Sequence, residues 1–488
     1  MVIESLKYKI LQQFGFAPTQ EQGQALDTFV SFLTDRDPQA VMILRGSAGT
    51  GKTSLSGAIV RTLLQIRQKV MLLAPTGRAA KVFSLGSGAP AYTIHRRIYR
   101  EKAFAGVDGQ FSLNDNLYTD TLFMVDEASM IANMGLGGTT FGSGCLLDDL
   151  VKFVYQGHND RLLLIGDKAQ LPPVGEEESP ALSASVMEGY GLKVYECDLN
   201  EVLRQSQSSG ILYNATLIRQ MITHDAVTGL PLIRFKGFAD IVMMPGAELV
   251  ESLGDSYHHV GMDETMVITR SNKRANIYNN GIRNMVLDRE EELSSGDMLM
   301  IVKNNYFWTE KEKKESGEGS AGAVPVFLAN GDRAKVLRVS NYIELYGFRF
   351  ATLLLQLPDY DDYEMQVTGM LDTLQSEAPA LTHEQQEELF RQVEEDYQHF
   401  VPLKADRMKS IRQDAYFNAL QIKYAYAVTC HKAQGGQWAH VYVDQGYMTD
   451  DMLTPDYIHW LYTAFTRATD KLFLVNWPKE QTCEPTDL

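Results

Sequence analysis

One short segment restricts the fold of this chain more than any other. Residues 46–53 read Gly46-Ser47-Ala48-Gly49-Thr50-Gly51-Lys52-Thr53, which matches the eight-residue phosphate-binding loop pattern. The loop follows an apolar stretch, Val41–Leu44, and leads into a helix-like stretch that begins at Ser54 and runs to Ile66. Its glycines let backbone N–H groups approach phosphates, and the N-terminus of the next helix adds a favourable dipole. The segment predicts an α/β fold in which Lys52 reaches the β- and γ-phosphates and Thr53 holds Mg²⁺.

The first third of the chain alternates short apolar stretches with helical patterns, which indicates a parallel sheet. The expected strands are Val41–Leu44, Val70–Ala74, Thr121–Val125 and Arg161–Ile165. A second series consists of Thr265–Thr269, Tyr424–Val428, His440–Val443 and Lys471–Val475. Two series with a single phosphate-binding loop predict paired sheet domains, of which the second assists hydrolysis instead of binding another nucleotide.

The pattern changes in residues 294–405, where short β-like stretches precede a charged helical segment. The stretches are Met298–Val302, Ala323–Leu328, Arg333–Val339 and Phe348–Gln356. They predict a small β-barrel inserted in the second sheet domain. The polar, glycine-containing segment Lys311–Ser320 is expected to be a mobile loop.

Two adjacent carboxylates follow the apolar stretch Thr121–Val125. Asp126 and Glu127 would therefore lie at the carboxyl end of a strand, where open α/β sheets bind their ligands. Asp126 suits the Mg²⁺ shell, and Glu127 suits a general base for the attacking water.

The bulk composition sets limits on the partners and the compartment. The 488 residues carry a formal net charge of -17, which is mild evidence against a nucleic-acid partner, although a groove can be basic locally. The sequence contains no apolar run long enough for a membrane span, and its N-terminus does not resemble a secretion signal. Four cysteines without metal-like spacing, Cys145, Cys197, Cys430 and Cys483, fit a reducing compartment, so we expect a cytoplasmic protein.

Further motifs follow one another in a fixed order along the chain. They are Pro18-Thr19-x-x-Gln22, the phosphate-binding loop, Ala74-Pro75-Thr76-Gly77-Arg78-Ala79-Ala80, Thr93-Ile94-His95, Asp126-Glu127-Ala128-Ser129-Met130, Gly166-Asp167-x-x-Gln170-Leu171-Pro172-Pro173-Val174-Gly175, Leu203-Arg204-Gln205, Thr429-Cys430-His431-Lys432-Ala433-Gln434-Gly435 and Tyr462-Thr463-Ala464-Phe465-Thr466-Arg467-Ala468. This order resembles the motif set of superfamily 1 helicases. It is most similar to the 5′-to-3′ branch, superfamily 1B, with its RecD-like, Dda-like and Pif1-like enzymes, and it extends from about residue 18 to residue 475.

The resemblance implies a fold and a set of parts. It implies two RecA-like parallel-sheet domains, with a small hairpin insertion in the first and an SH3-like β-barrel insertion in the second. The implied parts are domain 1A (1–95 and 121–205), a pin (96–120), domain 2A (206–293 and 406–488) and domain 2B (294–405).

The resemblance also implies roles at an ATP site. Gln22 would contact the adenine edge, and Gln170 would touch the γ-phosphate and couple hydrolysis to movement. Arg204 and Arg467 resemble arginine fingers, which stabilise charge on the phosphoryl group that is transferred. Arg467 is expected on a helix from Asp456 to Ala468. The cofactors implied are ATP and Mg²⁺, and the metal ligands are Thr53 and Asp126.

A DNA track is implied as well, formed by side chains that contact phosphates without reading bases. Its residues would be Pro75, Thr76, Arg78, Thr93, His95, Pro172, Pro173, Thr429, His431 and Lys432. For His95, a buried structural histidine is an equal alternative. The partners implied are single-stranded DNA and a forked duplex, and we expect a monomer with no membrane association.

One local signal is independent of the resemblance. The segment Phe104–Phe111 contains Asp108-Gly109, a dipeptide that favours a tight β-hairpin turn. A hairpin here could be a strand-separating pin or an ordinary surface hairpin.

The leading function is ATP-dependent 5′-to-3′ DNA unwinding, with ATP hydrolysed between two RecA-like domains. Two alternatives remain open at this level. One is a DNA-stimulated ATPase that remodels protein–DNA complexes without processive unwinding, and the other is an ATP-switched DNA-binding module. Glu127, Gln170, Arg204 and Arg467 disfavour the last, because a switch does not need hydrolysis residues.

Overall fold

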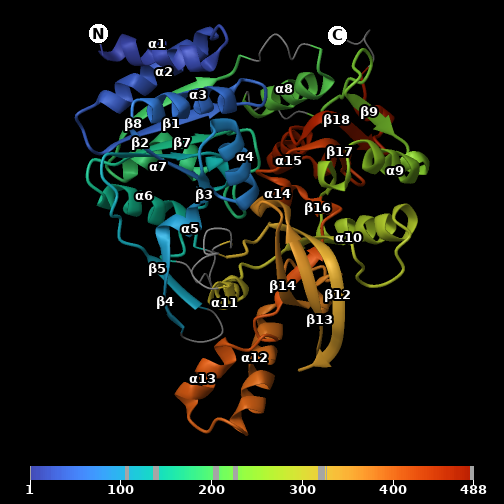
Figure 1. The fold of residues 1–488 in the computed structure, drawn as a ribbon. Helices are drawn as coiled ribbons and strands as arrows, with labels where there is room; N and C mark the ends of the chain where they lie inside the picture. The colour runs from blue at the N-terminus through green and yellow to red at the C-terminus, as the bar shows by residue number, and fades with distance from the viewer. Residues whose placement is uncertain are drawn as a thin grey trace. The chain divides into compact units, whose positions relative to one another are not determined.

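A computed structural model describes residues 2–104, 109–135, 142–201, 208–223, 229–316, 325 and 327–483 (Figure 1). It divides into two compact units. Unit 1 comprises Met1–Pro245 and Ala433–Leu488, and unit 2 comprises Gly246–Lys432.

Unit 1 is built on a six-stranded sheet whose neighbouring strands are all parallel. In sheet order the strands are β3 (Ala91–Thr93), β2 (Lys69–Ala74), β6 (Thr121–Val125), β7 (Arg161–Gly166), β1 (Ala40–Gly46) and β8 (Lys193–Leu199). All four strands predicted in this region are therefore confirmed. Because the strands are parallel, β1, β6 and β7 present their carboxyl ends at one edge.

Alternate residues of the central strand enter two separate cores. Met42 and Leu44 of β1 pack into one hydrophobic cluster, whereas Val41 and Ile43 pack into the other. The first cluster is closed by α1 (Val2–Phe14), α2 (Gln20–Thr34), α3 (Lys52–Gln65) and α4 (Gly77–Ser87). The second is closed by α5 (Ile94–Ile98), α6 (Leu146–Gln156) and α7 (Ala184–Gly189). Burial on both faces explains why these strands read as continuous apolar stretches instead of alternating ones.

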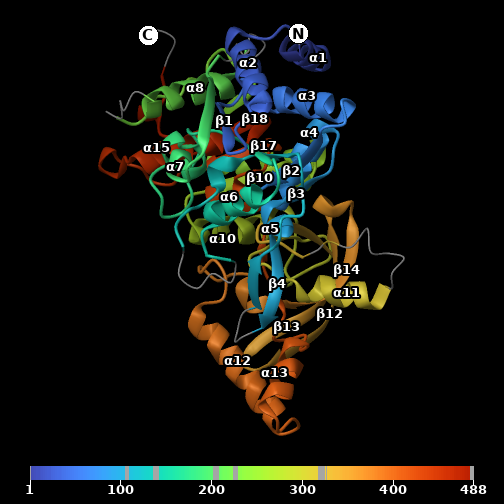
Figure 2. The same cartoon turned by 90° about the vertical axis from the view of Figure 1, so that its left-hand side faces the viewer.

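A hairpin extends from the α5 end of this unit, away from the six-stranded sheet (Figure 2). Strands β4 (Tyr99–Phe104) and β5 (Gly109–Leu113) pair antiparallel, so the predicted hairpin is confirmed in its two strands. Its turn residues 105–108, including Asp108, lie outside the described residues. Phe111 packs against the second core of the sheet, which anchors the base of the hairpin.

Unit 1 also contains part of the second strand series. Strands β9 (Ile241–Met244), β18 (Ala468–Val475) and β17 (Trp438–Asp444) run side by side and parallel. The helices that accompany them are α8 (Gly210–Thr223) and α15 (Pro455–Phe465). The expected helix Asp456–Ala468 is thus shorter than predicted, and Arg467 follows its end.

Unit 2 contains the parallel pair β10 (Thr265–Thr269) and β16 (Ala427–Thr429), with α9 (Leu249–His259) and α10 (Asn272–Gly281). It also contains a closed barrel of β11 (Met298–Ile301), β12 (Arg333–Leu345), β13 (Phe348–Leu357), β14 (Tyr363–Met370) and β15 (Leu420–Tyr424). A helical pair, α12 (His383–Gln398) and α13 (Lys404–Arg412), packs on the barrel through a small core around Phe350 and Val393. The predicted fold class, α/β with parallel sheets and a barrel insertion, is confirmed.

The inserted segment differs from prediction in two places, and one strand of the second series differs as well. The expectation of a loop is wrong for residues 311–316, because helix α11 (Phe307–Ser316) includes them, and Glu and Lys are good helix formers. The described part of Ala323–Leu328 forms no strand, and Leu328 makes an isolated bridge to Asn305. The expected strand Tyr424–Val428 is divided, since Tyr424 ends β15 and β16 begins at Ala427.

The barrel is thus closed by a strand that lies beyond residue 405 in the sequence. The two compact units also divide the chain differently from the four predicted parts, whose boundaries stay predictions. Within the described ranges, no helix has both the length and the apolar character needed to cross a bilayer.

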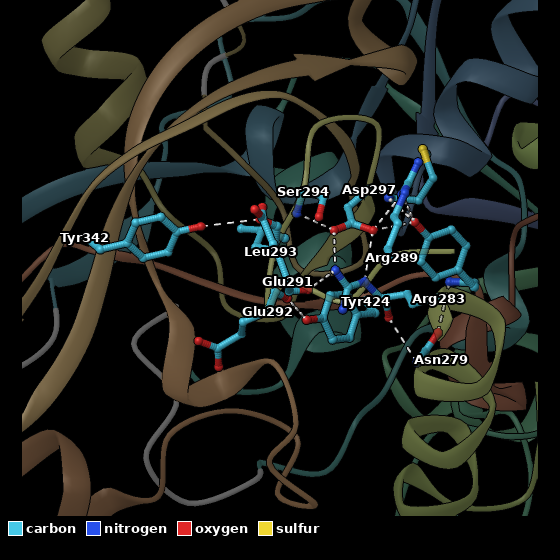
Figure 3. Close-up of polar contacts among 12 residues, drawn as sticks. Asn279, Arg283, Arg289, Glu291, Glu292, Leu293, Ser294, Asp297, Tyr342 and Tyr424 are labelled. Carbon is cyan, nitrogen blue, oxygen red and sulfur yellow. Dashed lines mark hydrogen bonds and ion pairs between the residues drawn. The ribbon is translucent and has the colours of Figure 1, made fainter. Parts of the chain in front are cut away.

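Unit 2 holds a buried ionic cluster, the Asp297 cluster, in which Arg283, Arg289 and Asp297 (Figure 3) are joined by the hydroxyl of Tyr426. Arg283 donates Nε and Nη2 to the two Asp297 oxygens, each at 3.0 Å. Arg289 Nη1 and the Tyr426 hydroxyl donate to Oδ1 at 2.6 and 2.7 Å. Burial by itself would raise the pKa of Asp297, but these hydrogen bonds and one from the Ser294 N–H hold the pKa below its usual value.

The Asp297 cluster joins the barrel to the helix that precedes it. Arg283 belongs to a π-helical turn, Ile282–Val286, that continues α10, whereas Asp297 directly precedes β11. Asn279 of α10 adds hydrogen bonds to the chain that links β15 to β16: its Oδ1 accepts the N–H groups of Tyr426 and Ala427 at 3.1 and 2.7 Å. The barrel is therefore fixed to α10 by contacts in which each charge has an opposite charge beside it.

Candidate active site

The phosphate-binding loop joins β1 to α3, as the sequence predicted. Gly49 and Gly51 have φ values of 77° and 81°, in the left-handed region that favours glycine. A Cβ on Gly46 would lie 2.7 Å from Lys52 Cγ and 2.9 Å from Thr50 Oγ1. Glycine at position 46 therefore makes room for the Lys52 side chain to cross the loop.

Lys52 lies over the start of the loop. Its Nζ donates to the Gly46 carbonyl, and to the Ser47 carbonyl at 3.2 Å. The same Nζ is 4.0 Å from Asp167 Oδ2. Thr53 and Ser54, in the first turn of α3, are exposed. The loop thus offers an ammonium group and a helix N-terminus to an anion.

The acidic pair sits at the carboxyl end of β6, at the same sheet edge as the loop. The Glu127 N–H donates to Asp126 Oδ1 at 2.9 Å, and Glu127 has a φ of 52°. This left-handed conformation costs a non-glycine residue roughly 1–2 kcal/mol, and such strain is often found at functional sites.

Burial and the neighbouring Glu127 charge raise the pKa of Asp126 to about 7, while the Lys52 charge opposes the shift. A buried pair of carboxylates of this kind gains from a bound cation. Mg²⁺ prefers hard oxygen ligands, and the Asp126 carboxylate and the Thr53 hydroxyl are such groups. The residues present therefore fit the predicted metal.

The segment after β7 places two further groups at this edge. Asp167 is buried; its Oδ1 accepts the Ala169 N–H at 3.0 Å. Gln170 is only 6% exposed, and its Oε1 has no hydrogen-bond partner among the described residues. A buried amide oxygen without a partner is costly, so it fits a position that is completed by a ligand or water.

Helix α15 contributes a tyrosine that the sequence analysis assigned no role. The Tyr462 hydroxyl donates to Asp167 Oδ2 at 2.6 Å and accepts the Ala48 N–H of the loop at 2.9 Å. Burial, followed by the Asp167 charge, raises the pKa of Tyr462 well above its usual value. The next residue also contacts this segment: Thr463 Oγ1 accepts the Leu171 N–H at 2.8 Å. The hydroxyl at position 462 thus links the loop to the segment after β7.

Arg467, predicted as an arginine finger, makes other contacts. It is 2% exposed, and its guanidinium donates to the carbonyls of Thr463 and Gly436 and to Thr466 Oγ1, at 3.0, 3.1 and 3.2 Å. None of these hydrogen bonds reaches the loop, so its role as a finger stays a prediction. Arg204, the other predicted finger, lies outside the described residues.

Gln22 contacts the phosphate-binding loop instead of presenting a free amide edge. It is 1% exposed, and its Nε2 donates to the Thr50 carbonyl at 2.9 Å. Its Oε1 accepts the Thr19 N–H at 3.0 Å, which completes a capping box at the start of α2. Both amide atoms are thus engaged in the fold, and the predicted adenine contact stays a prediction.

The predicted DNA residues of unit 1 have different environments. The hydroxyls of Thr76 and Thr93 accept N–H groups as the N-caps of α4 and α5. Arg78 stacks 4.6 Å over the Trp438 ring and donates to the Gln437 carbonyl. Pro75 is half-buried, whereas Pro172 and Pro173 are buried.

His95 is half-buried beside Tyr99, whose hydroxyl donates to Asp149 at 2.7 Å. Burial lowers the pKa of His95 to about 4, although the Asp149 charge opposes the shift. The imidazole is therefore neutral at pH 7, as expected for the structural alternative.

The predicted DNA residues of unit 2 lie at the end of β16 and directly after it. His431 is exposed, and Thr429 is half-buried. The Lys432 Nζ donates to Asn330 Oδ1, and burial, with the nearby Lys423 charge, lowers the pKa of Lys432 to about 8.

The structure places at the loop one arginine that the sequence analysis missed. Arg219 of α8 donates Nη1 to Ser47 Oγ at 2.5 Å. No sequence signal pointed to it, since α8 carries none of the quoted motifs.

Comparisons with known proteins agree with this site. A family model for an AAA domain matches residues 17–229, and one for a UvrD-like helicase C-terminal domain matches residues 424–475. The ATP-dependent RecD2 DNA helicase of Deinococcus radiodurans is 30% identical over 157 residues, which are 32% of this chain and 18% of that protein. The ATP-dependent DNA helicase dda of Enterobacteria phage T4 is 25% identical over 267 residues, 53% of this chain and 55% of that protein. The chain thus spans less than two thirds of either relative.

Among solved structures, a Pif1 helicase from Bacteroides in complex with ADP-AlF3 and single-stranded DNA is 13% identical, with a TM-score of 0.45 over 96% of this chain and 95% of that one. The resemblance expected from the motifs is confirmed by the two matched domains and the two curated helicases. The chain thus matches an AAA domain and a UvrD-like helicase C-terminal domain, and it resembles the superfamily 1 helicases of the RecD-like, Dda-like and Pif1-like branch.

Proposed function

We propose that this chain is an ATP-dependent motor that moves 5′ to 3′ along single-stranded DNA and separates duplex DNA. One observation carries the proposal: Lys52, the Asp126–Glu127 pair and Asp167 meet at one sheet edge beside a phosphate-binding loop. The Lys52 charge acts on Asp126, and Lys52 Nζ is 4.0 Å from Asp167, so the groups share one site.

The nucleotide would be held by the loop and by Lys52. Loop N–H groups from Gly46 to Ser54 would receive the phosphates, and the ammonium would lie between the β- and γ-phosphates. Thr53 and Asp126 would hold Mg²⁺, which supplies positive charge that stabilises the phosphate oxygens. A cation held there would favour the ionised form of Asp126, which burial disfavours.

Hydrolysis requires a base, an orienting group and charge stabilisation. Glu127 would take the proton of the attacking water, because its carboxylate follows the metal ligand directly. Gln170, with its unpartnered Oε1, would orient that water or sense the γ-phosphate. Arg204 and Arg467 would supply cations in the transition state, which requires Arg467 to exchange its present carbonyl partners.

The DNA track would use the ends of α4 and α5 in unit 1 and Thr429, His431 and Lys432 in unit 2. These groups contact phosphates without reading bases, as a motor indifferent to sequence requires. The proposal includes a monomeric, cytoplasmic enzyme. The free thiols at Cys145, Cys197, Cys430 and Cys483 agree with a reducing compartment.

The test combines an ATPase assay, with and without single-stranded DNA, with a forked-duplex assay. We expect DNA to stimulate ATPase, and a 5′-tailed duplex to be separated in preference to a 3′-tailed one. Glu127→Gln should retain ATP binding and lose turnover. DNA-stimulated ATPase without duplex separation would instead indicate a remodelling translocase, and ATP binding without turnover a switch.

A further inference from the structure

Arg219 occupies an unusual place for a buried cation. Its side chain is 9% exposed, and it reaches the phosphate-binding loop from α8, a helix without a helicase motif. Its acceptors are Ser47 Oγ at 2.5 Å and the Asn200 carbonyl at 3.4 Å from Nη2. Both acceptors are neutral. Because the hydrogen bonds of Arg219 within the described residues include none to a carboxylate, this buried guanidinium at an anion-binding loop favours an anion beside it.

Helix α8 is held firmly enough to aim this side chain. Asp240 caps its start, since Oδ1 accepts the Gly210 N–H at 2.7 Å and Oδ2 the Ser209 hydroxyl at 2.5 Å. Asn214 ties the next turn to Arg234 through two hydrogen bonds of 2.9 Å. A Cβ on Gly210 would lie 2.6 Å from Ile241 and Phe238 atoms, so the helix packs as closely as its backbone allows. Arg219 is therefore presented to the loop by a fixed element.

Arg219 and Lys52 converge on the same loop residue. Lys52 Nζ donates to the Ser47 carbonyl at 3.2 Å, while Arg219 Nη1 donates to the Ser47 hydroxyl at 2.5 Å. In phosphate-binding loops this lysine reaches the β- and γ-phosphates. Both cations therefore contact the same loop residue, which brings Arg219 to the part of the loop where the terminal phosphate of a bound triphosphate is expected.

We propose that Arg219 is a nucleotide-contact residue that exchanges its hydrogen bond to Ser47 for one to the terminal phosphate of ATP. This inference rests on the proposed function. Because ADP lacks that phosphate, Arg219 would distinguish the triphosphate from the diphosphate and would report this difference to α8. It would act in addition to the arginines expected from the motifs, Arg204 and Arg467.

The test uses the full chain with two substitutions at one position. Arg219→Gln keeps a hydrogen-bond donor for Ser47 but removes the charge, and Arg219→Lys keeps the charge without the planar fork. The binding of fluorescent ATP and ADP analogues is measured for each variant, together with ATPase kcat and KM on single-stranded DNA. Arg61→Ala is the matched control. The hydrogen bonds described for this arginine also go to neutral oxygens, the carbonyls of Gly86 and Gln13, and it lies on α3 away from the loop.

We expect Arg219→Gln to weaken ATP binding at least tenfold and ADP binding less than threefold, with kcat/KM reduced at least 100-fold. Arg219→Lys should recover part of the loss, and Arg61→Ala should match the wild type. Equal weakening of ATP and ADP with unchanged kcat would overturn the inference, since Arg219 would then only shape the loop. Wild-type behaviour of Arg219→Gln would overturn it too. A wild-type protein without DNA-stimulated ATPase would refute the proposed function, while the two binding measurements would still decide the role of Arg219.

Discussion

Two clusters of buried cations, one in each unit, differ in what surrounds the charge. In the Asp297 cluster, Arg283 and Arg289 share one buried carboxylate, which also receives a tyrosine hydroxyl and a backbone N–H. At the phosphate-binding loop, the hydrogen bonds of Arg219 and Lys52 go to hydroxyl and carbonyl oxygens, and Lys52 Nζ lies 4.0 Å from Asp167 Oδ2.

The difference separates a structural role from a ligand-binding one. A buried ion pair whose hydrogen bonds are satisfied has little to gain from another partner, so the Asp297 cluster holds elements together. Cations with only neutral acceptors can exchange them for phosphate oxygens at small cost. The Asp297 cluster is thus suited to keep its contacts, whereas the cations at the phosphate-binding loop are suited to exchange theirs for a ligand.

The largest expected effect tests whether the cations at the phosphate-binding loop serve ligand binding. Lys52→Ala should reduce ATPase turnover about 10³-fold or more, because it removes a cation from the developing phosphate charge. Its thermal unfolding midpoint should stay within about 2 °C of the wild type, since Lys52 donates only to loop carbonyls. A calorimetric scan beside the ATPase assay checks both. A large loss of thermal stability would mean that the loop cations are structural after all.

The next effect tests the structural role of the Asp297 cluster. Asp297→Asn should destabilise unit 2 by about 3–5 kcal/mol, because Arg283 and Arg289 lose the charge that balances them. Hydrogen exchange of residues 282–301 and 420–429, read by mass spectrometry in a urea series, localises the loss.

The matched control for Asp297 is Arg349→Gln. This arginine pairs with Glu292 and Asp372, but its side chain is 46% exposed. Such an exposed arrangement should contribute less than about 1 kcal/mol. If the two variants were equally destabilised, burial would not be what distinguishes the Asp297 cluster.

A smaller effect concerns the β4–β5 hairpin, a part of unit 1 that is neither cluster. Glu101 and Phe111 face each other in the hairpin register, so Gly-Gly in place of residues 102–110 would close a short turn there and keep Phe111 in the core. If the hairpin is a pin, duplex unwinding should fall at least tenfold, because separating a base-pair step costs roughly 1–2 kcal/mol and needs a rigid obstacle.

Streptavidin displacement from an end-labelled single strand, on the same preparation, measures translocation alone. It should be nearly unchanged, as should DNA-stimulated ATPase. Unwinding equal to the wild type would show that the fork is split elsewhere, and loss of both activities would show that the hairpin is structural.

The smallest effect concerns His95, a half-buried titratable group of unit 1. The pKa of His95 is about 4 in the fold, below the usual 6.5, so its contribution to stability is complete above pH 6.5 and is lost as the pH falls towards 4. The free energy of unfolding should decrease by about 1 kcal/mol between pH 7 and pH 5.5, because the unfolded chain gains a proton that the fold resists. Urea titrations of the wild type and of His95→Gln measure this; the variant should show a shallower pH dependence, and identical slopes would exclude His95 as the source.

Several features could be predicted from the sequence because they depend on local chemistry. The phosphate-binding loop needs its glycines and Lys52 within eight consecutive residues, and the strands before Gly46 and Asp126 are continuous apolar stretches. The Asp108-Gly109 signal likewise predicted a hairpin whose two strands the structure contains. The ordered motifs identified the family for the same reason, since each consists of neighbouring residues.

Other features were decided only by tertiary structure. Tyr462 and Arg219 reach the loop from 414 and 172 residues away in the sequence, and nothing local marks either residue for that contact. The Gln22 amide donates to the Thr50 carbonyl, and the Arg467 guanidinium donates to the carbonyls of Thr463 and Gly436, because each side chain takes the acceptors that packing brings to it. The barrel is closed by β15, which lies beyond the helical pair in the sequence, since strand pairing is non-local. Sequence thus determined which chemical groups the site contains, whereas long-range packing decided which of them meet.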